Sequence, residues 1–283
     1  MPETKQLGKD EAIGEYFIMG IVVILGIWIL FLFYNFVREV YDSIHSYFFD
    51  RIPVSRFAVR LRKLSLADSA VLQNTFLFYN QLTQRQQLFF NHRVVIFLEK
   101  YRIHGRDISI TKEMALTISG TYVMLTFGFR DYLSKSFERI VVYPSVYPSS
   151  VSDDYHKGEF NPATKSVVFS WEDFRDGHEI ENDNLNLGIH EFTHVLHFDS
   201  MRFQHANARL FRKHFNNILV LLTQDDYKQK IEEAALFRDY AKTNEFEFLA
   251  VLVEHFFESP VQLKTQLPEL YFSVARLLNC ERS

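Results

Sequence analysis

The feature that most constrains this chain is an uncharged apolar segment near its N-terminus. From Tyr16 to Val37 the sequence YFIMGIVVILGIWILFLFYNFV carries no charged side chain over 22 positions. An α-helix of this length reaches ~33 Å and matches the ~30 Å hydrocarbon core of a bilayer. A cleaved signal peptide would have an apolar region of ~7–15 residues followed by small residues, whereas Arg38 follows here. The segment therefore predicts one helix that spans a membrane, with a buried core helix as the alternative.

The charges on either side of this segment predict its orientation. Four acidic residues and two lysines precede it, whereas six basic residues follow it between Arg38 and Lys63. An excess of Lys and Arg marks the cytoplasmic side, so we expect the body of the protein in the cytoplasm. The basic stretch is either a solvated linker or a segment attracted to anionic headgroups. We divide the chain into an N-terminal tail (1–15), a transmembrane helix (16–37), a basic juxtamembrane linker or helix (38–75) and one domain (76–283).

The composition excludes several classes of protein. The 283 residues carry 31 basic and 35 acidic side chains, and a formal charge of −4 offers no broad basic surface for nucleic acid. Cys280 is the single cysteine, which excludes an intrachain disulfide framework and a Cys-rich zinc module. The 29 Phe and 14 Tyr residues indicate a core built on aromatic side chains. We expect no nucleic-acid partner.

Apolar periodicity predicts a mostly helical chain with a few short strands. Segments with helical spacing recur up to residue 127, and the chain from Asn184 onward is again mostly helical. The segment 144–160 contains Pro144, Pro148 and Gly158, and it is expected to form a loop. The predicted helices are 66–78, 84–101, 111–127 and 244–258, and the predicted strands are 140–143 and 166–170.

The chemistry of the sequence is concentrated in the pentapeptide His190-Glu191-Phe192-Thr193-His194, an H-E-x-x-H motif. Its i, i+4 spacing places both imidazoles on one face of a helix, where they can share a metal ion. Glu191 can then accept a proton from a water held by the metal. The alternative is a helix whose histidines are ordinary surface or core residues. The candidate N-cap residues of this helix are Asn182, Asp183 and Asn184.

A third metal ligand must come from elsewhere in the chain, because catalytic zinc usually takes three protein ligands. The sequence does not match the longer H-E-x-x-H-x-x-G-x-x-H pattern, in which a third His supplies the ligand. His197 stands at the position of the Gly, and Ser200 stands at the position of the third His. Glu247 and Glu254 lie seven residues apart on one face of the apolar predicted helix 244–258. Buried carboxylates need a partner such as a metal, although the two could also form a narrow solvated stripe. The candidates left open are His197, Asp199, His205, Glu232, Glu233, Glu247 and Glu254.

The chain from about Gln84 to Leu278 resembles the Mlc titration factor A (MtfA) family of zinc-dependent peptidases. The resemblance rests on the order and spacing of FLEKYRIHG, ISITKEMALTISGTYVMLTFG, RIVVYPSVY, GEF with SVVFSWEDF, HEFTHVLHF and NEFEFLAVLVEHFFESP. It implies an α+β, zincin-like metallopeptidase fold, similar to the protease domain of anthrax lethal factor. Two departures stand out: His197 replaces an Asp common in the family and precedes a stretch without glycine, and the best-known relatives are soluble.

The resemblance also implies roles for individual residues. In the family, the two motif histidines and a distal glutamate bind one zinc ion, and the motif glutamate is the general base. A tyrosine seven residues before the distal glutamate faces the metal. In this sequence the corresponding residues are His190, His194, Glu247, Glu191 and Tyr240.

Glu254 lies one helical repeat beyond Glu247 and carries no role in the resemblance. We expect its carboxylate to accept a hydrogen bond from the imidazole of a metal ligand. Compensation of its charge by a neighbouring Arg or Lys is the alternative.

These features predict a bacterial, single-pass inner-membrane zinc metallopeptidase that hydrolyses a peptide or protein substrate, with its catalytic domain in the cytoplasm. The alternative is a zinc-containing regulatory module that sequesters a transcription factor or another partner at the membrane without catalysis. The family name refers to binding of a sugar-uptake repressor, so the resemblance raises a regulatory protein as a further partner. A catalyst needs Glu191, whereas a sequestering module or a structural protein with a degenerate site does not.

Overall fold

The computed structural model describes residues 3–54, 61–148, 155–179, 184–238 and 244–280. The chain divides after Phe49 into two units, a long N-terminal helix and a body that begins at Asp50.

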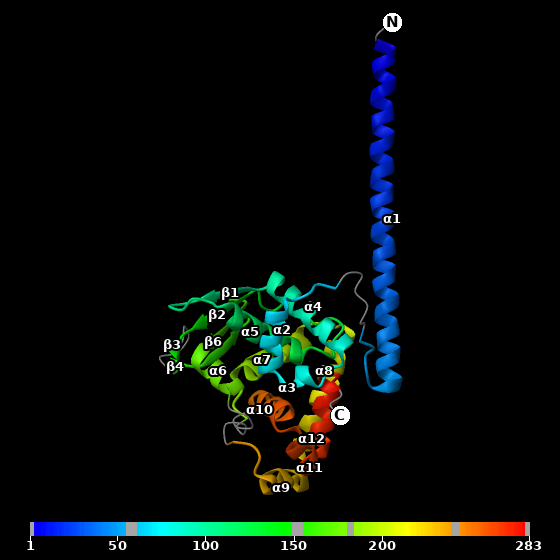
Figure 1. The fold of residues 1–283 in the computed structure, drawn as a ribbon. Helices are drawn as coiled ribbons and strands as arrows, with labels where there is room; N and C mark the ends of the chain where they lie inside the picture. The colour runs from blue at the N-terminus through cyan, green and yellow to red at the C-terminus, as the bar shows by residue number, and fades with distance from the viewer. Residues whose placement is uncertain (1–2, 55–60, 149–154, 180–183, 239–243, 281–283) are drawn as a thin grey trace. The chain divides into compact units, whose positions relative to one another are not determined.

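The N-terminal unit is the helix α1 (Glu3–Phe49), which runs for 47 residues without interruption (Figure 1). Its apolar side chains are exposed, with Ile24 at 67% and Leu30 at 68% exposure. The part from Gly14 to Phe49 is long and apolar enough to cross a membrane, and no other helix among the described residues meets both criteria. The predicted span 16–37 lies within α1, and the helix extends beyond it into the predicted linker.

The body contains one four-stranded sheet in the order β1-β2-β6-β5. Strands β1 (Arg102–Gly105), β2 (Arg139–Tyr143) and β6 (Ser166–Ser170) are parallel, and β5 (Gly158–Asn161) pairs antiparallel with β6 at the edge. The two strands predicted from β-branched runs are the central pair, β2 and β6. Four of the five side chains of β6 and two of the five of β2 are buried, which explains the strong apolar signal of these strands.

The prediction of a loop at 144–160 is wrong for most of the described residues of this segment, and its residues 149–154 lie outside the described part of the chain. The segment contains β3 (Tyr147–Pro148) and β4 (Tyr155–His156), which form a separate antiparallel pair, and it ends inside β5. Strands of two to four residues are too short to show a period of two. Such strands form because they pair with a partner strand, and the sequence of one strand does not indicate its partner.

Several helices of the body begin at hydrophilic N-cap residues. Ser65, Thr83 and Thr111 accept backbone N–H groups at the starts of α2, α4 and α5. The helices are α2 (Leu66–Thr75), α3 (Leu77–Asn80), α4 (Gln84–Lys100), α5 (Lys112–Leu125), α6 (Trp171–Glu179), α7 (Leu187–Arg202), α8 (Ala206–Thr223), α9 (Asp225–Ala234), α10 (Glu245–Glu258), α11 (Pro260–Gln266) and α12 (Pro268–Leu277).

The predicted helix 66–78 is wrong in its continuity, because Phe76 separates α2 from α3 in an extended conformation (φ −118°, ψ 107°). The Phe76 ring lies against Gly120 of α5, where an added Cβ would approach ring atom Cε2 to 2.4 Å. Packing of this ring into the space above a glycine overrides the local helical preference, which the sequence pattern does not reveal.

Helix α7 lies at the centre of the body and packs against α5, α8, α10 and the edge strand β5 (Figure 1). Its residue Phe192 is fully buried, with its ring centroid 5.1 Å from that of Tyr122 and 5.4 Å from that of Phe169. His190 and His194 stand two positions to either side of Phe192, and an α-helix turns by ~200° over two residues. Both histidines therefore face away from this aromatic core. The body is mostly helical with a small sheet, as predicted.

Candidate metal centre

The position of the motif is set by the start of α7. Asn186 caps this helix, and its side chain accepts a hydrogen bond from the Ile189 N–H at 3.0 Å. The expectation that Asn184 caps the helix is wrong, because Asn184 has a left-handed φ of 57° and α7 begins at Leu187. The other two expected caps, at 182 and 183, lie outside the described residues.

Helix α10 brings Glu247 to the two motif histidines. The Asn244 side chain accepts the Phe246 and Glu247 N–H groups at 2.9 and 3.0 Å and so fixes the first turn of α10. One Glu247 oxygen lies 2.9 Å from His190 Nε2, and the other lies 3.5 Å from His194 Nε2. One donor atom from each of the three residues lies within 4.8 Å of the other two.

The donor set of this cluster fits a divalent cation. It combines two imidazole nitrogens with a carboxylate oxygen, a set that catalytic zinc takes in proteins. The cluster also attracts a proton: although burial opposes the charge, hydrogen bonds to Glu247 and Glu254 raise the pKa of His190 to about 10. Burial alone would raise the pKa of Glu247. Its hydrogen bonds with His190 and His194 outweigh that effect and hold the pKa of Glu247 well below its usual range. The carboxylate is therefore ready to bind a cation without losing a proton.

Glu191 is buried beside this cluster and beneath the edge strand β5. A Cβ added to Gly158 of β5 would lie 2.8 Å from Glu191 Cγ and 2.9 Å from its Oε1, so the strand backbone packs directly on this side chain. Burial raises the pKa of Glu191, while the neighbouring positive charges of His190 and His194 oppose that rise. A raised pKa makes a carboxylate a better proton acceptor at neutral pH.

Glu254 is fully buried and contacts His190 from the side opposite to Glu247. Its Oε1 lies 2.7 Å from His190 Nδ1, and its Oε2 accepts the Asn186 N–H at 3.1 Å. Arg238 reaches both oxygens, at 3.0 and 3.1 Å. The two interpretations of Glu254 considered from the sequence therefore occur together, because an imidazole and a guanidinium share one carboxylate. Sequence reasoning did not find Arg238, which lies outside every motif.

The remaining candidate ligands lie elsewhere. His197 packs among aromatic rings, with its ring centroid 4.7 Å from that of Phe246, and burial lowers its pKa to about 4. Asp199 accepts a hydrogen bond from the Ser136 hydroxyl, and His205 caps α8. Glu232 and Glu233 are exposed on α9. Tyr240 lies outside the described residues.

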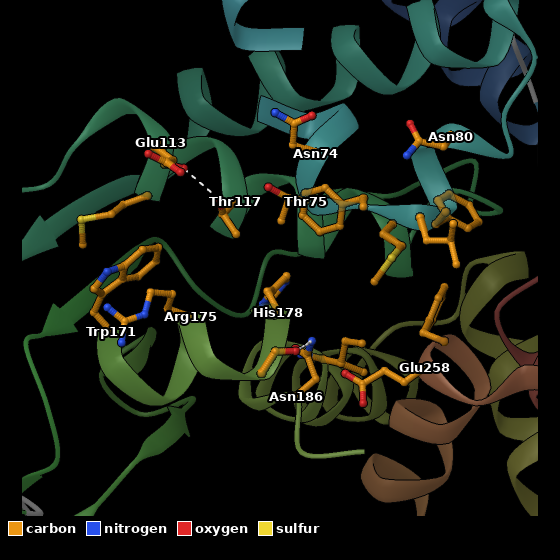
Figure 2. Close-up of a pocket in the computed structure, with 18 of the residues that line it drawn as sticks. Asn74, Thr75, Asn80, Glu113, Thr117, Trp171, Arg175, His178, Asn186 and Glu258 are labelled. Carbon is orange, nitrogen blue, oxygen red and sulfur yellow. Dashed lines mark hydrogen bonds between the residues drawn. The ribbon is translucent and has the colours of Figure 1, made fainter. Parts of the chain in front are cut away.

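A cavity of about 770 Å³ lies beside the N-terminus of α7, and α5, α6, the end of α10 and the segment from α2 to α3 form its walls (Figure 2). Its lining includes Asn186 and His178 but none of the motif residues. Both ring nitrogens of His178 have partners, since its Nδ1 lies 2.9 Å from the Phe174 carbonyl oxygen and its Nε2 2.9 Å from the Thr121 hydroxyl. Burial lowers the pKa of His178 to about 4, which keeps the ring neutral. Because none of the motif residues lines the cavity, it is separate from the metal cluster. Asn186 is the link between the two, since it lines the cavity and its N–H donates to Glu254.

Comparison with known proteins agrees with this geometry. Residues 54–278 match the family described as glucose-regulated metallo-peptidase M90. An uncharacterised protein of Synechocystis sp. is 24% identical over 236 residues, which cover 75% of this chain and 85% of that protein. Mlc titration factor A of Pectobacterium atrosepticum is 26% identical over 177 residues, which cover 56% of this chain and 64% of that protein, just under two thirds of its length.

The matched range includes the whole motif helix α7 and the helix α10 that carries Glu247. Metallopeptidases act through a bound metal ion, and the cluster of His190, His194 and Glu247 is a candidate site for it. The resemblance predicted from the sequence is confirmed: the chain belongs to the Mlc titration factor A family of M90 metallopeptidases.

Proposed function

We propose that this protein is a membrane-anchored, zinc-dependent peptidase whose metal is held by His190, His194 and Glu247. The observation that carries the proposal is the convergence of these three side chains from α7 and α10, with their donor atoms within 4.8 Å of one another. Membership of a metallopeptidase family supports the reaction class. One zinc ion per chain is expected, within a zincin-like fold.

Zinc bound by these residues would supply Lewis acidity, which polarises the scissile carbonyl and activates a water molecule. Glu191 would accept the proton of that water and pass it to the leaving amine, because its carboxylate is buried and its pKa is raised. Glu254 would hold the Nδ1–H of His190 and so direct Nε2 toward the metal. Tyr240 would donate a hydrogen bond to the carbonyl oxygen as negative charge develops on it.

We place this site in the domain 76–283, joined by the basic stretch 38–75 to a transmembrane helix at 16–37 and a tail at 1–15. The exposed apolar side chains of α1 support the anchor, since such a surface is costly in water. The basic residues after the span favour an inner-membrane protein with its catalytic domain in the cytoplasm. A peptide or protein is the expected substrate.

The alternative function is a regulatory module that holds a protein partner at the membrane. The name of the relative Mlc titration factor A favours this alternative, because it describes a factor that titrates Mlc. Both functions can share the fold and the metal, but they differ in their need for Glu191.

Hydrolysis of a peptide library by the wild type and by Glu191→Gln tests the proposal. The substitution preserves the size of the side chain but removes the group that accepts the proton. We expect Glu191→Gln to retain its zinc and to lose about 10²–10⁴-fold in activity. A loss of less than about tenfold would show that Glu191 is not the base. A wild-type protein that binds zinc but cleaves no library peptide would favour the regulatory alternative.

A further inference from the structure

Arg238 follows α9 and contacts Glu254, the carboxylate that lies beside the candidate ligand His190. Its Nη2 donates to both oxygens of Glu254, at 3.0 and 3.1 Å, and its Nη1 donates to the Asn184 carbonyl at 3.2 Å. The Arg238 side chain is 31% exposed, whereas that of Glu254 is fully buried. Arginine suits this arrangement because its planar fork can contact two oxygens and a carbonyl at once.

The Glu254 carboxylate joins Arg238 to the candidate ligand His190. The oxygen that lies 2.7 Å from His190 Nδ1 also accepts from Arg238, while the second oxygen accepts from Arg238 and from the Asn186 N–H. The Asn186 N–H and the His190 ring come from the first residues of α7 and its cap, and the guanidinium comes from Arg238, which follows α9. The carboxylate therefore has little freedom to rotate away from the imidazole.

The orientation of His190 depends on this carboxylate. With Nδ1–H donated to Glu254, the other nitrogen, Nε2, faces Glu247 and the candidate metal position. Carboxylate contacts of this kind orient metal-binding histidines and raise their basicity. A buried carboxylate that lost its cation would need a new partner or would have to reach water. Either change would withdraw the acceptor from His190 Nδ1.

We propose that Arg238 is a positioning residue of the metal centre, which acts through Glu254 to orient His190 and touches neither metal nor substrate. The inference rests on the proposed function, because it takes His190 as a metal ligand. It adds a residue that neither the motif nor the resemblance identifies, 48 positions after His190 in the sequence.

Zinc affinity and the visible spectrum of the cobalt(II)-substituted, full-length protein in detergent test the inference. We expect Arg238→Met to weaken zinc binding by about 10–100-fold and to shift the cobalt bands, because the geometry of His190 changes. Arg238→Lys should recover part of the affinity, since it restores the charge but not the fork. Arg139→Met is the matched control, because Arg139 also donates to a backbone carbonyl (Thr164 O, 3.1 Å) but contacts no part of the cluster. This control should bind zinc as the wild type does.

The double variant Arg238→Met/Glu254→Gln separates positioning from folding. Arg238→Met alone should lower the urea midpoint, because it leaves the buried Glu254 carboxylate without its cation. The double variant removes both charges of the pair, so its urea midpoint should return toward that of the wild type. Its zinc affinity should stay low, because an amide oxygen accepts from His190 more weakly than a carboxylate does. Wild-type zinc affinity in Arg238→Met, or its full recovery in the double variant, would overturn the inference and leave the proposed function intact. A wild-type protein without zinc affinity would instead refute the ligand set itself.

Discussion

At the scale of single residues, a proton would compete with the proposed metal for His190. Both of its nitrogens lie within hydrogen-bond distance of carboxylates, Nδ1 of Glu254 and Nε2 of Glu247. Although burial opposes the charge, these contacts raise the pKa of His190 to about 10, so the metal-free ring carries both protons at neutral pH. A metal that binds Nε2 must displace one of them.

We therefore expect zinc binding to release about one proton per chain at pH 7.5. The zinc affinity should rise by about tenfold for each pH unit between pH 7 and 9, because the competing proton is bound throughout this range, below the pKa of about 10. Glu247 should add nothing to this release, since its pKa is already low. Calorimetric titrations in buffers of different ionisation enthalpy measure the proton count. Zinc binding without proton release at pH 7.5 would contradict the assignment of His190 as a ligand.

The residues of the site differ in how well the sequence predicts them. The spacing of His190, Glu191 and His194 is local, and one helical turn is enough to bring the two imidazoles to one face. Periodicity alone left several candidates for the third ligand, and the family resemblance was needed to favour Glu247. Arg238 could not be predicted, because its contact with Glu254 is created by the tertiary fold.

At the scale of elements, the N-cap of α10 fixes the turn that carries Glu247. Asn244 accepts the N–H of Glu247 itself at 3.0 Å, so this cap stabilises the helix and also sets the direction of the candidate ligand.

Asn244→Ala should therefore affect both stability and metal binding. We expect a loss of about 1 kcal/mol in the free energy of unfolding, typical of a lost cap. We also expect a fall of roughly tenfold in zinc affinity, of the size seen when groups that orient a ligand are removed. Thr83→Ala is the matched control, because Thr83 caps α4 and contacts none of the candidate ligands. Urea unfolding and zinc titration of both variants measure the two effects. Equal zinc affinities in the two variants would show that the cap does not position Glu247.

Local signals also explain which elements the sequence predicts. The predicted helices 84–101 and 111–127 correspond to α4 and α5, which begin at threonine caps that can be read in the sequence. The break at Phe76 depends on contact with Gly120 across the core, so the pattern of 66–78 could not indicate it. The strands β3 and β4 were missed because each has only two residues.

At the scale of the whole molecule, the apolar surface of α1 is the feature that supports the proposed membrane anchor. Side chains such as Ile24 and Leu30 are more than half exposed along the segment that could cross a membrane. A surface of this kind is stable in lipid and promotes aggregation in water.

We expect the full-length protein to sediment with membranes and to resist extraction by high salt, because apolar burial rather than charge would hold it there. Detergent should release it. Leu25→Arg with Ile29→Arg, near the middle of the span, should weaken membrane insertion, since charged side chains are costly in the hydrocarbon core. Fractionation and immunoblotting measure the distribution. Release of the wild type by salt alone would contradict the anchor.

The zinc content of the full-length protein, measured by elemental mass spectrometry, tests the central claim most directly. Glu247 and Glu254 both contact His190, from opposite sides of its ring, but only Glu247 also lies near His194. We expect about one zinc per chain in the wild type and a metal-depleted Glu247→Ala protein. Glu254→Ala should keep most of its zinc with weaker binding, because it loses an orienting contact rather than a ligand. Loss of zinc from Glu254→Ala together with full retention in Glu247→Ala would contradict the proposed metal centre.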